Sequence, residues 1–167
     1  YYRDVPSFTV HREDPTSSKF MFKLMTNLSN AMVAKDAAAM IDHARADSAA
    51  DASRVGTTGY CMSGPFALWI AAEFPDVEKS AASIHGVKRA LDADDSPHRR
   101  VGDISGEVLV MAAEHDHFVD RPHYDRLVAA LEAAGTNAYC EWVLIFTFAF
   151  ILFRFVARRF RHCGPML

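Results

Sequence analysis

Strand-like and helix-like segments alternate through most of this sequence, and that alternation is the strongest limit on its fold. Short runs of small, branched and apolar residues predict strands, whereas apolar residues three and four positions apart predict helices. This order predicts an α/β domain with a mostly parallel sheet and helices on both of its faces. The predicted strands span 54–60, 79–85, 107–113 and 137–142, and the predicted helices span 18–46, 65–74 and 121–134.

Composition narrows the class of protein further. The chain has 167 residues and is 50% hydrophobic, which is enough for one domain with a core of its own. Its net charge is −3 and its basic residues are scattered, so the sequence does not favour nucleic acid as a partner. Three cysteines, Cys61, Cys140 and Cys163, are too few and too irregularly spaced for a disulfide framework. We expect a reducing, cytoplasmic compartment.

The C-terminal part of the sequence has an unusual composition. Residues 143–156 (VLIFTFAFILFRFV) are almost wholly apolar, and a basic stretch follows them. Fourteen residues that include an arginine are short of the roughly 20 that span a bilayer. The pattern favours a buried strand that runs into a poorly formed terminal segment. A membrane anchor with its arginines at the headgroups and a changed reading frame after Trp142 are the alternatives. The first residues, Tyr-Tyr-Arg, contain no Met and no secretory signal.

A cysteine stands between the first predicted strand and the helix after it, in the hexapeptide GYCMSG (59–64). Ligands of open α/β sheets bind beyond the C-terminal ends of the strands, which is where this places Cys61. Small neighbours allow a sharp strand-to-helix turn that raises the side chain above the sheet. The helix N-terminus favours a thiolate, and the Met62 amide is placed to stabilise an oxyanion. The alternative is a buried, inert cysteine beside a glycine-rich turn.

A second polar cluster, AAEHDHFVD (112–120), follows the strand with the strongest apolar character. Asp116 therefore also lies at a C-terminal strand end, where a carboxylate can orient a histidine that serves a nucleophile. Asp120 suits the role of helix N-cap better, which leaves Asp116 for chemistry. His115 and His117 could instead ligate a metal, although the sequence offers no third ligand nearby.

These segments together resemble the dienelactone hydrolase family of α/β-hydrolases, which use a cysteine nucleophile. VGTTGYCMSG resembles the nucleophile turn of that family, and EVLVMAAEHDHFVD resembles its aspartate-bearing strand and loop. The resemblance covers residues 1–142 in order and spacing, with SIHG (83–86), DSPH (95–98), EW (141–142) and the opening YYR as further matches. It implies a partial α/β-hydrolase domain over 1–142, with the N-terminal strands missing, and a divergent tail over 143–167.

The resemblance also implies roles for particular residues. Cys61 would be the nucleophile, Asp116 the orienting acid, the Met62 amide half of the oxyanion hole, and Arg3 a residue that binds the substrate carboxylate. The implied reaction is hydrolysis of a small-molecule enol-lactone or ester through a cysteine acyl-enzyme, with no metal or organic cofactor.

The sequence departs from the family at the catalytic histidine. Alignment of FTFAF (146–150) with the family's HGF segment places Phe146 where the histidine is expected, and phenylalanine cannot accept a proton. His85 is a weak substitute, whereas His98 lies in a loop and His162 lies too far along the chain. We therefore expect impaired activity; the alternative is a non-catalytic relic or a binding protein with the same fold. Missing N-terminal strands would also expose a sheet edge and favour self-association.

Overall fold

The computed structural model describes residues 9–11 and 13–143, and its contacts divide the chain into two compact units, Tyr1–Ala52 and Ser53–Leu167. None of the helices in this described part is long and apolar enough to cross a membrane. The apolar segment 144–156 and Phe146 lie outside the described residues. The expected domain limit at 142 therefore stays a prediction.

The first unit contains two helices, α1 (Pro15–Thr26) and α2 (Asn30–Ala46). The single helix expected over 18–46 is therefore wrong. The chain breaks because the Ser29 hydroxyl accepts a hydrogen bond from the Met32 amide at 3.2 Å, which starts a new helix. Serine side chains compete in this way with the backbone, and apolar spacing alone does not reveal the break.

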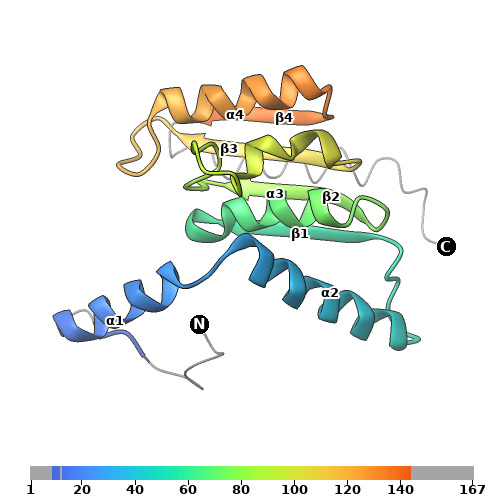
Figure 1. Ribbon diagram of the computed structural model, residues 1–167, viewed down its shortest axis with the longest axis horizontal. Helices are drawn as coiled ribbons and strands as arrows, with labels where there is room; N and C mark the ends of the chain where they lie inside the picture. The colour runs from blue at the N-terminus through green and yellow to red at the C-terminus, as the bar shows by residue number, and fades with distance from the viewer. Residues whose placement is uncertain (1–8, 12, 144–167) are drawn as a thin grey trace. The chain divides into compact units, whose positions relative to one another are not determined.

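The second unit contains a parallel four-stranded sheet in the order β1-β2-β3-β4, as Figure 1 shows. A parallel sheet was expected from the sequence and is confirmed. Helix α4 has the predicted limits, with Asp120 as its N-cap and Gly135 in the left-handed conformation at its end. The elements are β1 (Val55–Tyr60), α3 (Gly64–Glu73), β2 (Glu78–Ile84), β3 (Glu107–Ala113), α4 (Arg121–Ala134) and β4 (Ala138–Val143).

Both helices of this unit pack on the same face of the sheet (Figure 1). The strand order never reverses, and right-handed crossovers that all step in one direction bring their helices to one side. Among the described residues of this unit no helix covers the other face, so the expected covering of both faces is not found there. The segment between β2 and β3, expected as a loop, contains two short 3₁₀ turns, Pro97–Arg99 and Val101–Asp103.

Alternate residues of the strands divide the core into two clusters. Val108, Val110 and Ala112 of β3 face the helices and pack with Leu68 and Leu127. Residues of the opposite parity form the second cluster, which contains Ile84, Leu109, Met111 and Val143. β3 has a continuous apolar run because both of its faces are buried.

A buried carboxyl group lies at the N-terminal end of β2, opposite the end of the sheet that carries Cys61. Glu78 is 1% exposed, and its Oε1 atom accepts hydrogen bonds from the Thr57 amide at 2.8 Å and the Thr57 hydroxyl at 3.0 Å. Burial raises the pKa of Glu78 to about 7, against the opposing effect of the bonds from Thr57. The folded protein therefore holds a proton here more tightly than the unfolded chain does.

We expect the free energy of unfolding to fall as pH rises from the ordinary glutamate range to about 7, and then to level off. Over this pH range the free energy of unfolding should fall by about 3 kcal/mol at most, since each pKa unit corresponds to about 1.4 kcal/mol. Urea unfolding at a series of pH values measures it. Glu78→Gln should flatten this slope, with Glu107→Gln as the matched control. An unchanged slope in Glu78→Gln would contradict the assignment.

Candidate active site

A strained turn joins β1 to α3 and carries Cys61 at its tip. Cys61 has a φ of 49°, and Cys61–Ser63 form one 3₁₀ turn before α3 begins. Left-handed backbone is uncommon in residues other than glycine and clusters at functional sites. The Cys61 side chain is a free thiol on an exposed residue. The thiol is therefore accessible at the C-terminal edge of the sheet.

Two glycines make this sharp turn sterically feasible. A Cβ atom on Gly59 would lie 2.1 Å from the backbone oxygen of Ser63. A Cβ atom on Gly64 would lie 2.4 Å from the Cα atom of Gly86. Any side chain at either position would meet backbone atoms that cannot rotate away. The small residues in the hexapeptide therefore allow the close approaches that the sequence pattern predicts.

The Ser63 hydroxyl closes the turn, a role that the small size of the residue does not predict. It accepts a hydrogen bond from the Tyr60 amide at 2.8 Å and donates one to the Tyr60 carbonyl at 2.9 Å. Both bonds join Tyr60, directly before Cys61, to Ser63, two positions after it. A hydroxyl near a turn is the sequence signal for such bonds, because serine side chains often bond to nearby backbone groups.

The segment after β2 packs directly against this turn. The Val87 amide donates a hydrogen bond to the Cys61 carbonyl at 3.1 Å. His85 and Lys88 in the same segment have φ values of 50° and 51°. Together with Cys61, they are the non-glycine residues with positive φ within residues 9–11 and 13–143. Backbone strain in this part of the chain is thus concentrated at one edge of the sheet.

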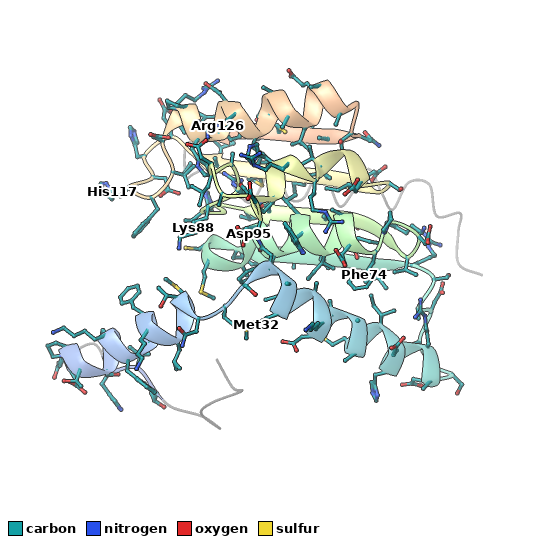
Figure 2. All side chains as sticks on the ribbon, in the orientation of Figure 1. Met32, Phe74, Lys88, Asp95, His117 and Arg126 are labelled. Atoms are coloured by element: carbon teal, nitrogen blue, oxygen red, sulfur yellow. The ribbon has the colours of Figure 1, made fainter. Side chains whose placement is uncertain are left out.

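Asp116 lies in the loop that follows β3, at the same edge. Its Oδ1 atom accepts a hydrogen bond from the Phe118 amide at 2.8 Å, which fixes the carboxylate on its own loop. Figure 2 labels His117 of this loop and Lys88 of the segment after β2, and both lie at the same end of the sheet. Phe74, labelled at the end of α3, lies toward the other end. The structure therefore brings Cys61 and Asp116 to one edge.

His85 stands between these two residues in the order of the strands. Its amide donates a hydrogen bond to the Met111 carbonyl at 2.8 Å, which ties the end of β2 to the end of β3. Burial lowers the pKa of His85, whereas the charge of Asp116 raises it and the charge of Arg89 lowers it. The imidazole therefore lies within electrostatic reach of Asp116, and its neutral form is favoured.

Arg89 is a buried cation near this edge, and no sequence pattern predicts its burial. It is 0% exposed, and its Nη1 atom donates a long hydrogen bond of 3.5 Å to the Met111 carbonyl. Burial lowers the pKa of Arg89 to about 10. A basic residue in an apparent surface loop normally points into water, so only the three-dimensional packing reveals it. The nearby charge of Asp116 favours the protonated guanidinium.

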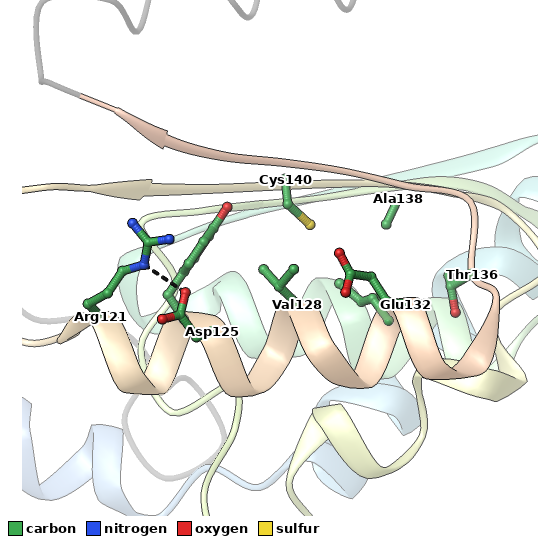
Figure 3. Close-up of a pocket in the computed structure, with 9 residues that line it drawn as sticks. Arg121, Asp125, Val128, Glu132, Thr136, Ala138 and Cys140 are labelled. Atoms are coloured by element: carbon green, nitrogen blue, oxygen red, sulfur yellow. Dashed lines mark hydrogen bonds and ion pairs between the residues drawn. The ribbon is translucent and has the colours of Figure 1, made fainter.

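The cavity in Figure 3 lies elsewhere, between α4 and the edge strand β4. Its volume is about 360 Å³, and Cys140 projects into it. Burial raises the pKa of the Cys140 thiol to about 11, which keeps that thiol protonated and unreactive. Arg121, which lines the cavity, pairs with Asp125 at 2.7 Å and lies over the Trp142 ring. We assign this cavity no catalytic role.

Of the other residues predicted for the site, some lie in the described part of the chain and Arg3 does not. Met62 is the second residue of the 3₁₀ turn, directly after Cys61, and its role as an oxyanion donor stays a prediction. Arg3 lies outside the described residues, so its role also stays a prediction. His115 and His117 are exposed on the loop around Asp116. Across the described part of the chain, no group of three or more metal-ligating side chains could hold an ion.

The parallel four-stranded sheet with its flanking helices matches a partial α/β-hydrolase fold, and Cys61 lies on the turn that follows its first strand. The model of the dienelactone hydrolase family matches residues 1–150. This chain belongs to that family. The family is one of hydrolases, and the resemblance seen in the sequence is confirmed.

Solved structures support the same fold. A protein from Klebsiella pneumoniae assigned to the dienelactone hydrolases is 23% identical, with a TM-score of 0.68 over 81% of this chain and 55% of its own. A dienelactone hydrolase-like promiscuous phosphotriesterase from metagenomic libraries is 20% identical, with a TM-score of 0.60 over 79% of this chain and 52% of its own. The chain thus spans about half the length of these structures. A sequence search of curated proteins gave no match.

Proposed function

We propose that this chain cleaves a carboxylic ester or an enol-lactone through an acyl-enzyme on Cys61. The observation that carries the proposal is the exposed thiol at a φ of 49°, raised on the turn between β1 and α3. A buried structural cysteine, which the sequence left open as an alternative, would have no need of this strained and accessible position. Family membership supports hydrolysis as the class of reaction.

In the proposed reaction, the Cys61 thiolate attacks the carbonyl carbon and the carbonyl electrons move to oxygen. Collapse of this oxyanion expels the alcohol or enolate oxygen, which takes up a proton, and leaves a thioester on Cys61. Water then attacks the thioester, releases the carboxylic acid and restores the thiol. The Met62 amide would stabilise the oxyanion, Asp116 would orient the base, and Arg3 would bind a carboxylate on the substrate.

We further propose that turnover is slow. Phe146 occupies the position at which the family carries its histidine, and loss of one catalytic residue costs orders of magnitude in rate. Deacylation, which needs an activated water, should suffer more than acylation. The acyl-enzyme should therefore accumulate, and that accumulation makes the proposal testable without fast turnover.

The test is to mix the protein with p-nitrophenyl acetate, quench with acid and map the peptides by mass spectrometry. We expect one acetyl group on the peptide that contains Cys61 and none on the peptide that contains Cys140. Prior alkylation of Cys61 should abolish the acetylation. An unmodified Cys61 peptide at high ester concentration would contradict the proposal and favour a non-catalytic binding protein of the same fold.

A further inference from the structure

We propose that His85 is the proton acceptor for Cys61 and stands in for the histidine that the family carries after its last strand. This inference rests on the proposed function of Cys61 and adds a residue to it. Three neighbouring strands would then supply the reacting groups in the spatial order cysteine, histidine, acid. Such constellations are defined by geometry and role rather than by order along the chain.

The strand register places the backbones of Cys61 and His85 at the ends of adjacent strands. Tyr60 of β1 and Ile84 of β2 are partners in the parallel ladder, so the residues that follow them leave the sheet together. Neighbouring strands lie about 4.8 Å apart, which is within reach of a thiol and an imidazole on adjacent strand ends. Both residues adopt left-handed backbone, with φ values of 49° and 50°.

The two strand ends are also locked together. The Val87 amide bonds to the Cys61 carbonyl, and close packing of Gly86 on Gly64 leaves no room for the segment after β2 to shift. On the other side, the His85 amide bonds to the Met111 carbonyl of β3. The position of His85 is therefore fixed relative to both neighbouring strands. A base held in this way does not depend on a flexible loop for its placement.

The charges around His85 suit a proton acceptor. Asp116, on the loop after β3, stabilises an imidazolium once it forms, and Arg89 opposes its formation at rest. With burial also favouring the neutral ring, the imidazole is ready to accept the Sγ proton of Cys61. The thiolate electron pair then forms the bond to the carbonyl carbon, and the imidazolium returns its proton to the leaving oxygen.

The rate of Cys61 alkylation by iodoacetamide at neutral pH, followed on the Cys61 peptide, tests this inference without ester turnover. His85→Asn is the informative variant because asparagine tolerates left-handed backbone. We expect alkylation to slow by about 10-fold or more in His85→Asn, since the imidazole promotes the thiolate form that reacts. His98→Asn is the matched control and should leave the rate unchanged, because His98 bonds to Ser96 instead.

A second variant separates chemistry from structure. His85→Gly relieves the backbone strain and leaves a space, so added imidazole should restore much of the alkylation rate, whereas it should not do so in His85→Asn. Equal alkylation rates in the parent protein and His85→Asn would overturn the inference, even if ester acetylates Cys61. Conversely, slow alkylation in His85→Asn together with an ester that never acetylates Cys61 would uphold the role of His85 and refute the proposed hydrolysis.

Discussion

Replacement of Cys61 by alanine is expected to abolish ester hydrolysis, whereas replacement of Cys140 by alanine is expected to leave it nearly unchanged. Because turnover of the parent protein is itself expected to be slow, the difference lies in the rapid first release of p-nitrophenol that accompanies acylation. Cys61→Ala should lose this release and show only the uncatalysed background. Cys140 lies in the cavity beside α4, where burial raises the pKa of its thiol to about 11 and keeps it unreactive. The pair therefore compares the same substitution at an exposed cysteine and at a partly buried one.

Backbone strain at position 61 does not affect the comparison between Cys61→Ala and Cys140→Ala. Cys61 already adopts a φ of 49°, and alanine has a similar cost in that conformation, so Cys61→Ala should fold as the parent does. Far-ultraviolet circular dichroism and the urea midpoint provide the check. Release of p-nitrophenol from its acetate ester measures the rate. If Cys61→Ala hydrolyses the ester as fast as the parent protein, the nucleophile lies elsewhere.

The sheet could be predicted closely from the sequence because its strands carry distinct signals. β3 is buried on both faces and appears as an unbroken apolar run, and its predicted limits, 107–113, are those observed. Helix α4 is bounded by an aspartate cap and a glycine, which are local signals, and its predicted limits are also those observed. Both elements are defined by their own residues rather than by distant contacts.

Two features of the fold depend on information that apolar spacing does not contain. The break between α1 and α2 comes from one hydrogen bond that the Ser29 hydroxyl accepts from the Met32 amide. The packing of α3 and α4 on one face comes from a strand order that never reverses, and that order depends on tertiary pairing. A regular helix–strand alternation is compatible with either arrangement.

The candidate site also has one part that local sequence predicts and another that depends on tertiary structure. Cys61 and its small neighbours form a local pattern, so the turn could be predicted from adjacent residues. The placement of His85 beside Cys61 depends on the register between β1 and β2, which no local pattern encodes. Burial of Arg89 depends on how the segment after β2 folds back over β3. Local sequence patterns therefore predict Cys61 and Asp116 as site residues, whereas the surroundings of His85 and Arg89 emerge only from the tertiary structure.

The largest expected loss of stability follows from substitution of the glycines at the turn that carries Cys61. Gly59→Ala would place a methyl group 2.1 Å from the backbone oxygen of Ser63, and Gly64→Ala would place one 2.4 Å from the Cα atom of Gly86. Neither contact can be relieved by rotation of a side chain. Overpacking against fixed atoms costs about 3 kcal/mol or more, so we expect each variant to be severely destabilised or to fold with a displaced turn.

Gly102→Ala is the matched control, because its new methyl group would lie 3.6 Å from the nearest atom, the Ala134 Cβ, in ordinary van der Waals contact. Its stability should change by less than about 1 kcal/mol, and a gain is expected if the lower entropy of the unfolded chain dominates. Urea unfolding of the three variants measures the difference. If Gly59→Ala has parental stability, the turn must have rearranged to admit the methyl group. Such a rearrangement should change the rate at which Cys61 is alkylated. Parental stability together with unchanged Cys61 reactivity would contradict the close packing on which the elevated position of the thiol depends.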